Sequence, residues 1–271
     1  EEVDGARQHL LRDLEALHMA SAITGIEGGA VRGFANRDTP GAGQDTETTP
    51  LFDGQGNPLP MEKDNGTWRE DNSGGDYASF IWEDSCSRDM LIGWAMAYGA
   101  IWEVAEEDDS IDESLKERLR SDALALALGL MEVQDNGYDL ELMDADGRTT
   151  YHGYLNENNL DRMYIDGVRN GFHTIMALGI LAALADVADD PAVDAYLYDE
   201  LIAQREFDVI ARDNLLLLNM DTGTNFSNYN MTVQGAWLAL RHLGDEASRA
   251  VVQQAFEAQI YDTPDARFQP V

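Results

Sequence analysis

From Arg88 onward, apolar residues recur at the spacing of an α-helix, and this periodicity constrains the fold more than any other feature of the chain. One apolar stripe runs through Leu91, Trp94, Tyr98 and Ile101, which lie three or four residues apart. Residues at this spacing share one face of a helix, so that face must pack against other elements. The sequence therefore predicts a fold built mainly from packed helices.

The same periodicity predicts helices in most of the remaining chain. They are expected at about residues 4–24, 112–134, 160–187, 192–218, 228–243 and 245–259, with Pro191 and Gly244 at two of the boundaries. Two short alternating segments, 138–142 and 148–151, flank Asp146-Gly147. That dipeptide is typical of a β-hairpin turn, so one small hairpin is expected between the helices.

Long helices joined by short turns alternate in direction. We therefore predict an all-α fold, in which antiparallel helical hairpins form a complete or partial α/α toroid with one small β-hairpin. A plain helical bundle is the alternative. Residues 1–271 are interpreted as a single helical domain. Residues 33–80 are rich in Gly and Pro and lack periodicity, which predicts a long irregular segment that could cover a cleft.

The charge balance excludes several classes of partner. Acids outnumber bases by 51 to 18, and the formal net charge is -33. Nucleic acid and anionic membrane surfaces are disfavoured, because both are bound through clustered Lys and Arg. The acids form either a solvated coat, as in a salt-adapted protein, or a site that attracts cations such as Ca²⁺. Oligomerisation is compatible with this composition.

The sequence gives only limited information on the cellular compartment and redox state of the protein. Cys86 is the single cysteine, so an intrachain disulfide is excluded. We expect no apolar run long enough to span a membrane. The chain begins at Glu1 rather than Met, and we expect a secreted, periplasmic or cell-surface protein whose leader was removed. The cytoplasm of a halophile is the alternative.

The segment from Trp82 to Asp89 places acids, serines and an arginine at the start of a strongly patterned helix. Free backbone N–H groups at a helix start favour anions. Arg88 could neutralise a substrate carboxylate, and Asp84 or Asp89 could act as a general acid or base. The structural alternative makes Ser87 the N-cap of the helix, with Asp89 in its first turn. Cys86 as a nucleophile is a weaker reading, because no histidine lies near it in sequence.

Two further polar clusters could contribute to a site. Tyr151 and His152 follow the predicted hairpin, where an imidazole could transfer protons or simply bond within a loop. Asn228 and Tyr229 open another predicted helix, and amides and phenols suit sugar hydroxyls. Trp82 could offer a stacking face. The alternative is that these residues cap helices and pack in the core.

Resident metals and nucleotides have little support in the sequence. The chain has no HExxH motif, no paired Cys/His spacing and no Gly-rich phosphate loop. Residues 144–147 match only the start of a calcium loop, and a turn is the favoured interpretation. We therefore expect no cofactor, with Ca²⁺ as the alternative.

Four segments occur in an order that covers most of the chain between residues 23 and 240: 23–33, 82–93, 146–153 and 225–230. In these segments the chain resembles exported bacterial α/α-toroid proteins of the six-hairpin glycosidase-like group, many of which are uncharacterised. The resemblance implies a carbohydrate-active toroid, although the chain has fewer helices than a complete ring needs.

These observations predict a carbohydrate-active enzyme that acts on a polysaccharide or oligosaccharide. In a lyase, Arg88 would neutralise a uronate, and Tyr151, His152 or Tyr229 would move protons. A hydrolase would use two acids from the set Asp84, Asp89, Asp161 and Asp166. A polyanionic substrate further requires arginines to converge, drawn from Arg32, Arg69, Arg88, Arg148, Arg162 and Arg169. The alternative is a non-catalytic exported protein that binds glycans or assembles through its helical faces.

Overall fold

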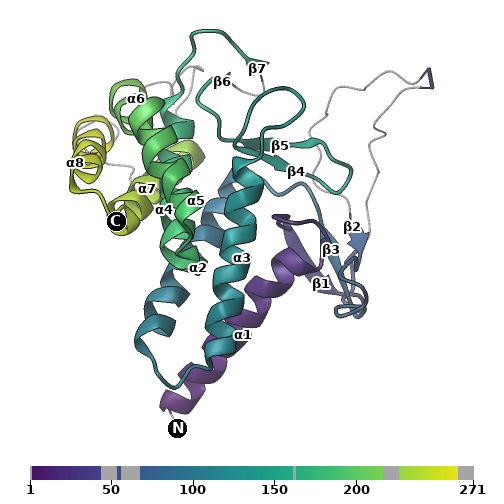
Figure 1. The fold of residues 1–271 in the computed structure, drawn as a ribbon. Helices are drawn as coiled ribbons and strands as arrows, with labels where there is room; N and C mark the ends of the chain where they lie inside the picture. The colour runs from purple at the N-terminus through teal and green to yellow at the C-terminus, as the bar shows by residue number, and fades with distance from the viewer. Residues whose placement is uncertain (1, 44–53, 56–67, 161–162, 216–225, 262–271) are drawn as a thin grey trace.

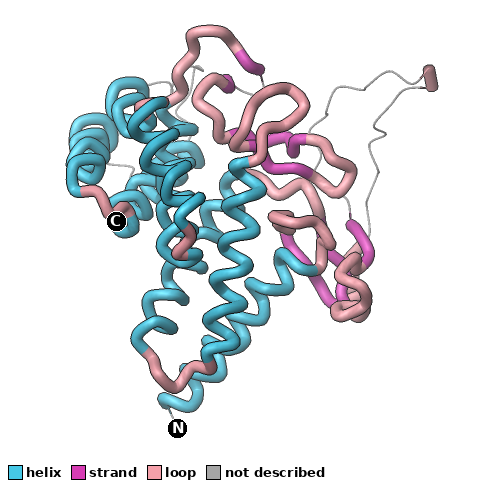
Figure 2. Tube along the Cα trace, in the orientation of Figure 1, coloured by secondary structure: helices cyan, strands magenta, loops and turns pink. Residues whose placement is uncertain are grey.

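The fold mixes helices with short strands. The computed structural model describes residues 2–43, 54–55, 68–160, 163–215 and 226–261. About 58% of this part is helical, and 11% is strand in three small sheets, as Figure 2 shows. The predicted all-α toroid is therefore wrong. Strands of two to six residues leave too little alternation in a sequence to be recognised by their period.

The helices carry most of the chain (Figure 1). They are α1 (Glu2–Ala22), α2 (Arg88–Glu107), α3 (Glu113–Met131), α4 (Gly171–Ala188), α5 (Pro191–Ala195), α6 (Phe207–Asn214), α7 (Phe226–His242) and α8 (Glu246–Ala255). Two π-helical segments, η1 (Tyr196–Gln204) and η3 (Phe256–Tyr261), continue α5 and α8.

Most of the predicted helices are confirmed, with two changes at their ends. Helix α2 begins at Arg88 directly after Ser87, as predicted. The helix expected at 160–187 begins instead at Gly171, because the residues before it pair as strands. The helix expected at 192–218 is interrupted at Glu206, whose left-handed φ of 57° separates η1 from α6. Residues 216–218 lie outside the described part of the chain.

A three-stranded antiparallel sheet joins the end of α1 to the start of α2. Its order is β1–β3–β2, with β1 (Gly33–Asn36), β2 (Trp68–Glu70) and β3 (Phe80–Glu83). Residues 33–80 were expected to be irregular, and these strands show that the segment is partly regular. Its residues 44–53 and 56–67 lie outside the described part. The sheet has a small core of its own, made by Met19, Ile23, Val31 and Trp82.

Two hairpins lie between α3 and α4. The predicted hairpin is confirmed: β4 (Glu141–Met143) pairs antiparallel with β5 (Thr149–Tyr154) around Asp146-Gly147. A second pair, β6 (Asn159–Leu160) with β7 (Met163–Tyr164), was not predicted. Figure 1 shows both hairpins at the end of the helical bundle where α3 finishes. Polar connecting segments therefore gather at that end.

Helix α4 is the centre of the hydrophobic core. Helices α2, α3, α6 and α7 pack around it, and all its residues except Asp186 are buried. Among the described residues, α4 is the one helix that is both long enough and apolar enough to cross a membrane. Its mean hydropathy is 1.7. This corrects the expectation that the chain has no such run. In this structure 94% of the helix is buried inside the protein, as expected of a core helix.

Two glycines allow α7 to lie directly against α4. A Cβ added at Gly179 would overlap the carbonyl oxygen of Gly235. A Cβ added at Gly235 would lie 2.8 Å from the carbonyl oxygen of Ile175. The two backbones are therefore in contact at this crossing, and helices that cross so closely need residues without side chains there.

We expect Gly179→Ala to destabilise the protein by about 3 kcal/mol, because the added methyl group would force the two backbones apart. Gly93→Ala is the matched control, since Gly93 lies in α2 with no atom within 4 Å of its added Cβ. That change should stabilise the protein by about 1 kcal/mol, the helix preference of Ala over Gly. Urea unfolding measures both values. Equal effects of the two substitutions would contradict the close crossing.

Candidate functional site

Three segments distant in sequence meet where α2 and α4 begin. The Thr150 hydroxyl of β5 donates a hydrogen bond of 2.6 Å to the carbonyl oxygen of Cys86, just before α2. At the first residue of α2, the Arg88 guanidinium lies over the Phe172 ring of α4, 5.2 Å from its centroid. Tyr151 and His152 follow Thr150 in β5. We call Arg88, Phe172, Tyr151 and His152 together the α2–α4 site.

The α2–α4 site combines a cation over an aromatic ring with the tyrosine and imidazole that follow Thr150 in β5. Arg88, Tyr151 and His152 are half-buried. The Tyr151 and His152 rings meet edge to face, with centroids 4.6 Å apart. Arginine over an aromatic face is attracted by the ring quadrupole, which helps to fix its direction. Three of the predicted site residues thus lie at one end of the bundle.

The backbone just before α2 is held in an unusual conformation. Ser85 has a φ of 65° and is one of four described residues other than glycine with positive φ. It is buried between Asp84 and Cys86, which are themselves buried. This conformation costs a non-glycine residue about 1–3 kcal/mol and persists only where surrounding contacts hold it. Such strain often accompanies functional sites.

Asp84 belongs to a ladder of alternating charges that joins the sheet to the β4–β5 hairpin. Its carboxylate is 2% exposed, and the Arg69 Nε donates to it at 2.6 Å. Arg69 also bonds Asp146 at 2.7 Å, and Arg148 pairs with Asp144 at 2.7 Å. A buried carboxylate in such a pair connects structural elements. This ladder suits Asp84 to a structural role.

The other predicted residues of this region differ in exposure. Asp89 is exposed in the first turn of α2 and accepts a hydrogen bond from the Ser87 hydroxyl. Ser87 is the N-cap residue, but its side chain makes no capping hydrogen bond. Arg32 forms an ion pair of 3.5 Å with Glu83, beside the three-stranded sheet. Trp82 is 2% exposed and its indole donates to the Glu70 carbonyl oxygen, so this ring is part of the sheet core.

The predicted residues of α7 lie partly inside the core. Tyr229 is 7% exposed and belongs to the main hydrophobic cluster. Asn228 is half-buried, and its carbonyl oxygen accepts from the Thr232 hydroxyl. Residues 161, 162 and 225 of the predicted clusters lie outside the described part of the chain.

Burial controls the protonation of two groups near the site. Burial is the main cause that raises the pKa of the Cys86 thiol to about 12, and the nearby negative charge of Asp89 adds to the shift. A thiol of this kind stays protonated at neutral pH and is a poor nucleophile. Burial is also the main cause that lowers the pKa of His173 to about 3, and the positive charge of Arg88 adds to the shift. The neutral imidazole donates from Nδ1 to the carbonyl oxygen of Asn156 at 3.1 Å.

A buried ionic cluster beneath the hairpins was not predicted. Arg205 bridges two carboxylates, with its Nη2 3.0 Å from Asp139 and its Nε 3.0 Å from Glu157. Tyr196 donates to Asp139 at 2.6 Å. Burial alone would lower the pKa of Arg205, but the hydrogen bonds to Glu157 and Asp139 outweigh it and raise that pKa. Because its partners are far apart in sequence, local patterns carry no signal for this cluster.

Comparisons with known proteins leave the family open. No protein-family model matches the chain, and the searches of curated proteins and of solved structures found no match either. The resemblance to toroid proteins therefore stays a prediction. Among the described residues, no group of three or more His, Cys, Asp or Glu could hold a metal ion.

We expect His173 to make the protein sensitive to acid. Its pKa is about 3 when folded, against an ordinary value of 6.5. Between these values the unfolded state binds a proton that the folded state does not. Stability is therefore fully present above pH 6.5 and falls toward pH 3, by up to about 1.4 kcal/mol per pH unit. In urea unfolding between pH 7 and pH 4.5, the free energy of unfolding should fall less for His173→Gln than for the wild type.

The exposed His9 provides the control for this measurement. His9→Gln should keep the wild-type pH dependence, because it leaves the buried His173 in place. If His173→Gln and the wild type lost stability equally as the pH falls, the buried neutral imidazole would not be the cause.

Proposed function

We propose that the protein binds a neutral oligosaccharide at the α2–α4 site. The observation that supports this most is the position of Arg88 over Phe172, beside a strand tied to the same helix start by Thr150. Phe172 is 4% exposed, so the half-buried Tyr151 offers the ring on which the apolar face of a sugar would stack. Guanidinium and imidazole groups bond sugar hydroxyls. Small-ligand sites combine rings with a few such polar groups.

The placement of the arginines favours a neutral ligand over a uronate. An anionic glycan would need several arginines to converge on it. Four of the arginines considered are already engaged with acids, in the pairs Arg32–Glu83, Arg69–Asp84, Arg148–Asp144 and Arg169–Glu206. The net charge of -33 also repels polyanions. The lyase mechanism is thus less well supported than recognition of an uncharged sugar.

Asp89 supports glycoside hydrolysis as a second candidate. Its carboxylate is exposed in the same helical turn as Arg88, at the proposed sugar site. Hydrolysis by two carboxylates needs a second acid about 5–10 Å away. Asp84 is engaged by Arg69, so that partner has to come from another segment. The binding function requires no such partner and is the better supported of the two.

We expect Arg88→Gln to weaken the binding of a neutral oligosaccharide about tenfold, equivalent to about 1.4 kcal/mol. Arg120→Gln is the matched control, because Arg120 is also half-buried and lies over the Trp102 ring at 4.6 Å. Calorimetric titration with neutral and uronic-acid oligosaccharides of equal length measures both variants.

Three results would contradict the proposal: tighter binding of the uronic-acid series, equal binding by the two variants, or no binding of any neutral oligosaccharide. Incubation of the wild type with the bound oligosaccharide tests the second candidate. Release of shorter sugars that Asp89→Asn abolishes would support hydrolysis.

A further inference from the structure

Three tyrosines form a cluster on the hairpins, outside the hydrophobic core. The rings of Tyr138 and Tyr164 are stacked, with centroids 3.5 Å apart and planes 3° from parallel. Tyr154 meets Tyr164 edge to face, with centroids 6.1 Å apart. All three residues are half-buried, and none belongs to either hydrophobic cluster of the described residues. We call Tyr138, Tyr154 and Tyr164 the tyrosine platform.

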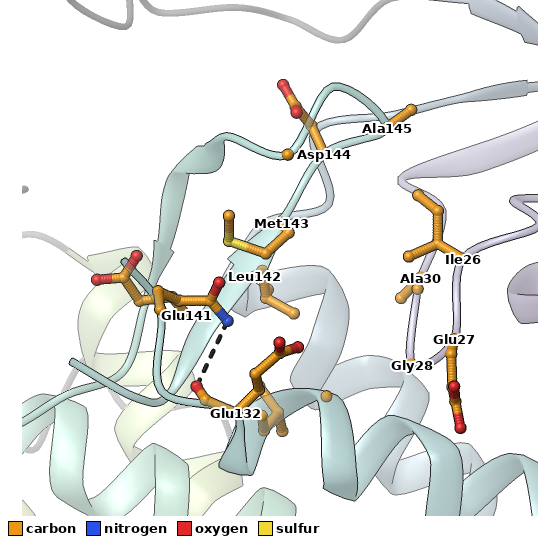
Figure 3. A pocket seen from close by; sticks show the side chains of 15 residues that line it. Ile26, Glu27, Gly28, Ala30, Glu132, Glu141, Leu142, Met143, Asp144 and Ala145 are labelled. Atoms are coloured by element: carbon orange, nitrogen blue, oxygen red, sulfur yellow. Dashed lines mark hydrogen bonds between the residues drawn. The ribbon is translucent and has the colours of Figure 1, made fainter. Parts of the chain in front are cut away.

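Tyr164 is held in place by a buried carboxylate. Its hydroxyl donates to Glu141 of β4, which is 2% exposed and also accepts from the Asn136 amide at 2.9 Å. Figure 3 shows the Glu141 carboxylate pointing away from the cavity that Leu142 and Ala30 line. Burial is the main cause that raises the pKa of Tyr164, and the hydrogen bond to Glu141 adds to the shift. The phenol therefore stays protonated at neutral pH and remains a donor.

Tyr138 is held in place through its backbone. Its N–H donates to the Asn136 side-chain oxygen at 2.9 Å, and its carbonyl oxygen accepts from the Gln134 N–H at 2.8 Å. Among the rings of the described residues, that of Tyr164 is the one that Tyr138 contacts. Tyr164 thus covers one face of the Tyr138 ring. The half-burial of Tyr138 matches a ring whose other face is open to solvent.

The properties of the tyrosine platform suit a neutral sugar. A ring that is already fixed loses little freedom when a ligand stacks on it, which lowers the cost of binding. Tyrosine combines an apolar face with a polar hydroxyl, as a sugar combines apolar faces with hydroxyl groups. A nucleotide would also stack, but its phosphates would be repelled by the net charge of -33.

Strand β5 connects the tyrosine platform to the α2–α4 site. Tyr151, His152 and Tyr154 all belong to this strand, and at the rise of an extended strand the Cα atoms of Tyr151 and Tyr154 are about 10 Å apart. A short oligosaccharide spans such a distance, whereas a single sugar does not. We propose that the tyrosine platform is a second sugar subsite, which binds the outer sugars of a neutral oligosaccharide held at the α2–α4 site. The subsite thus rests on the glycan binding proposed above.

Calorimetric titration with a neutral disaccharide and a neutral hexasaccharide of the same sugar tests this proposal. The wild type should bind the hexasaccharide about tenfold more tightly, because only the longer chain reaches both parts of the site. Tyr138→Ala should remove this gain and leave the disaccharide affinity within about twofold of the wild-type value. Tyr138→Phe keeps the ring and should keep the gain.

Tyr77→Ala is the matched control for Tyr138→Ala. Tyr77 is also half-buried and also contacts another ring, that of His18, with centroids 6.5 Å apart. It packs against the core of the three-stranded sheet instead of the hairpins. Its substitution should leave both affinities at the wild-type values.

Chemical modification of the wild type tests the platform without a substitution. N-acetylimidazole acetylates tyrosine hydroxyls that solvent reaches, and mass spectrometry of peptides locates the modified residues. The hexasaccharide should protect Tyr138 from acetylation, and the disaccharide should not. Equal wild-type affinity for the two lengths, equal effects of Tyr138→Ala and Tyr77→Ala, or no protection of Tyr138 would overturn the subsite alone. Failure of the wild type to bind either length would overturn the glycan-binding function and the subsite together.

Discussion

The close crossing of α4 and α7 is the constraint on which the rest of the structure depends. Because Gly179 and Gly235 let the two backbones touch, α4 can be surrounded by helices and buried along its length. A helix buried in this way must satisfy its polar start from within the fold. The Asn170 side chain does so by accepting from the N–H groups of Phe172 and His173. That cap sets the position of the Phe172 ring at the α2–α4 site.

Electrostatics then limits which ligands the protein can attract. The chain has 18 basic residues against 51 acids, and several of its arginines hold structural elements together. Arg69 joins the sheet to the β4–β5 hairpin, and Arg205 joins three loops beneath the hairpins. Removing one partner from a buried pair leaves an uncompensated charge, which costs about 3–5 kcal/mol. Arginines held in this way are poorly placed to bind an anionic substrate.

The sequence predicted the parts of the fold that depend on local patterns. The start of α2 at Arg88 and the hairpin around Asp146-Gly147 both follow from short motifs. The β1–β3–β2 sheet was missed because its strands are short and lie far apart in the chain. At the site, Arg88 and His152 were identified as polar residues near helix or strand ends. Phe172 was missed, since only the packing of α4 against α2 brings its ring under Arg88.

The most direct test of the account is a crystal structure of the protein soaked with neutral and uronic-acid oligosaccharides together. The account predicts density for a neutral sugar against Arg88, Tyr151 and His152, with a sugar ring on an aromatic face. The Arg69–Asp84 and Arg148–Asp144 pairs should be unchanged. A uronate bound by those arginines with their ion pairs broken would contradict the account, as would a sugar bound away from the start of α2.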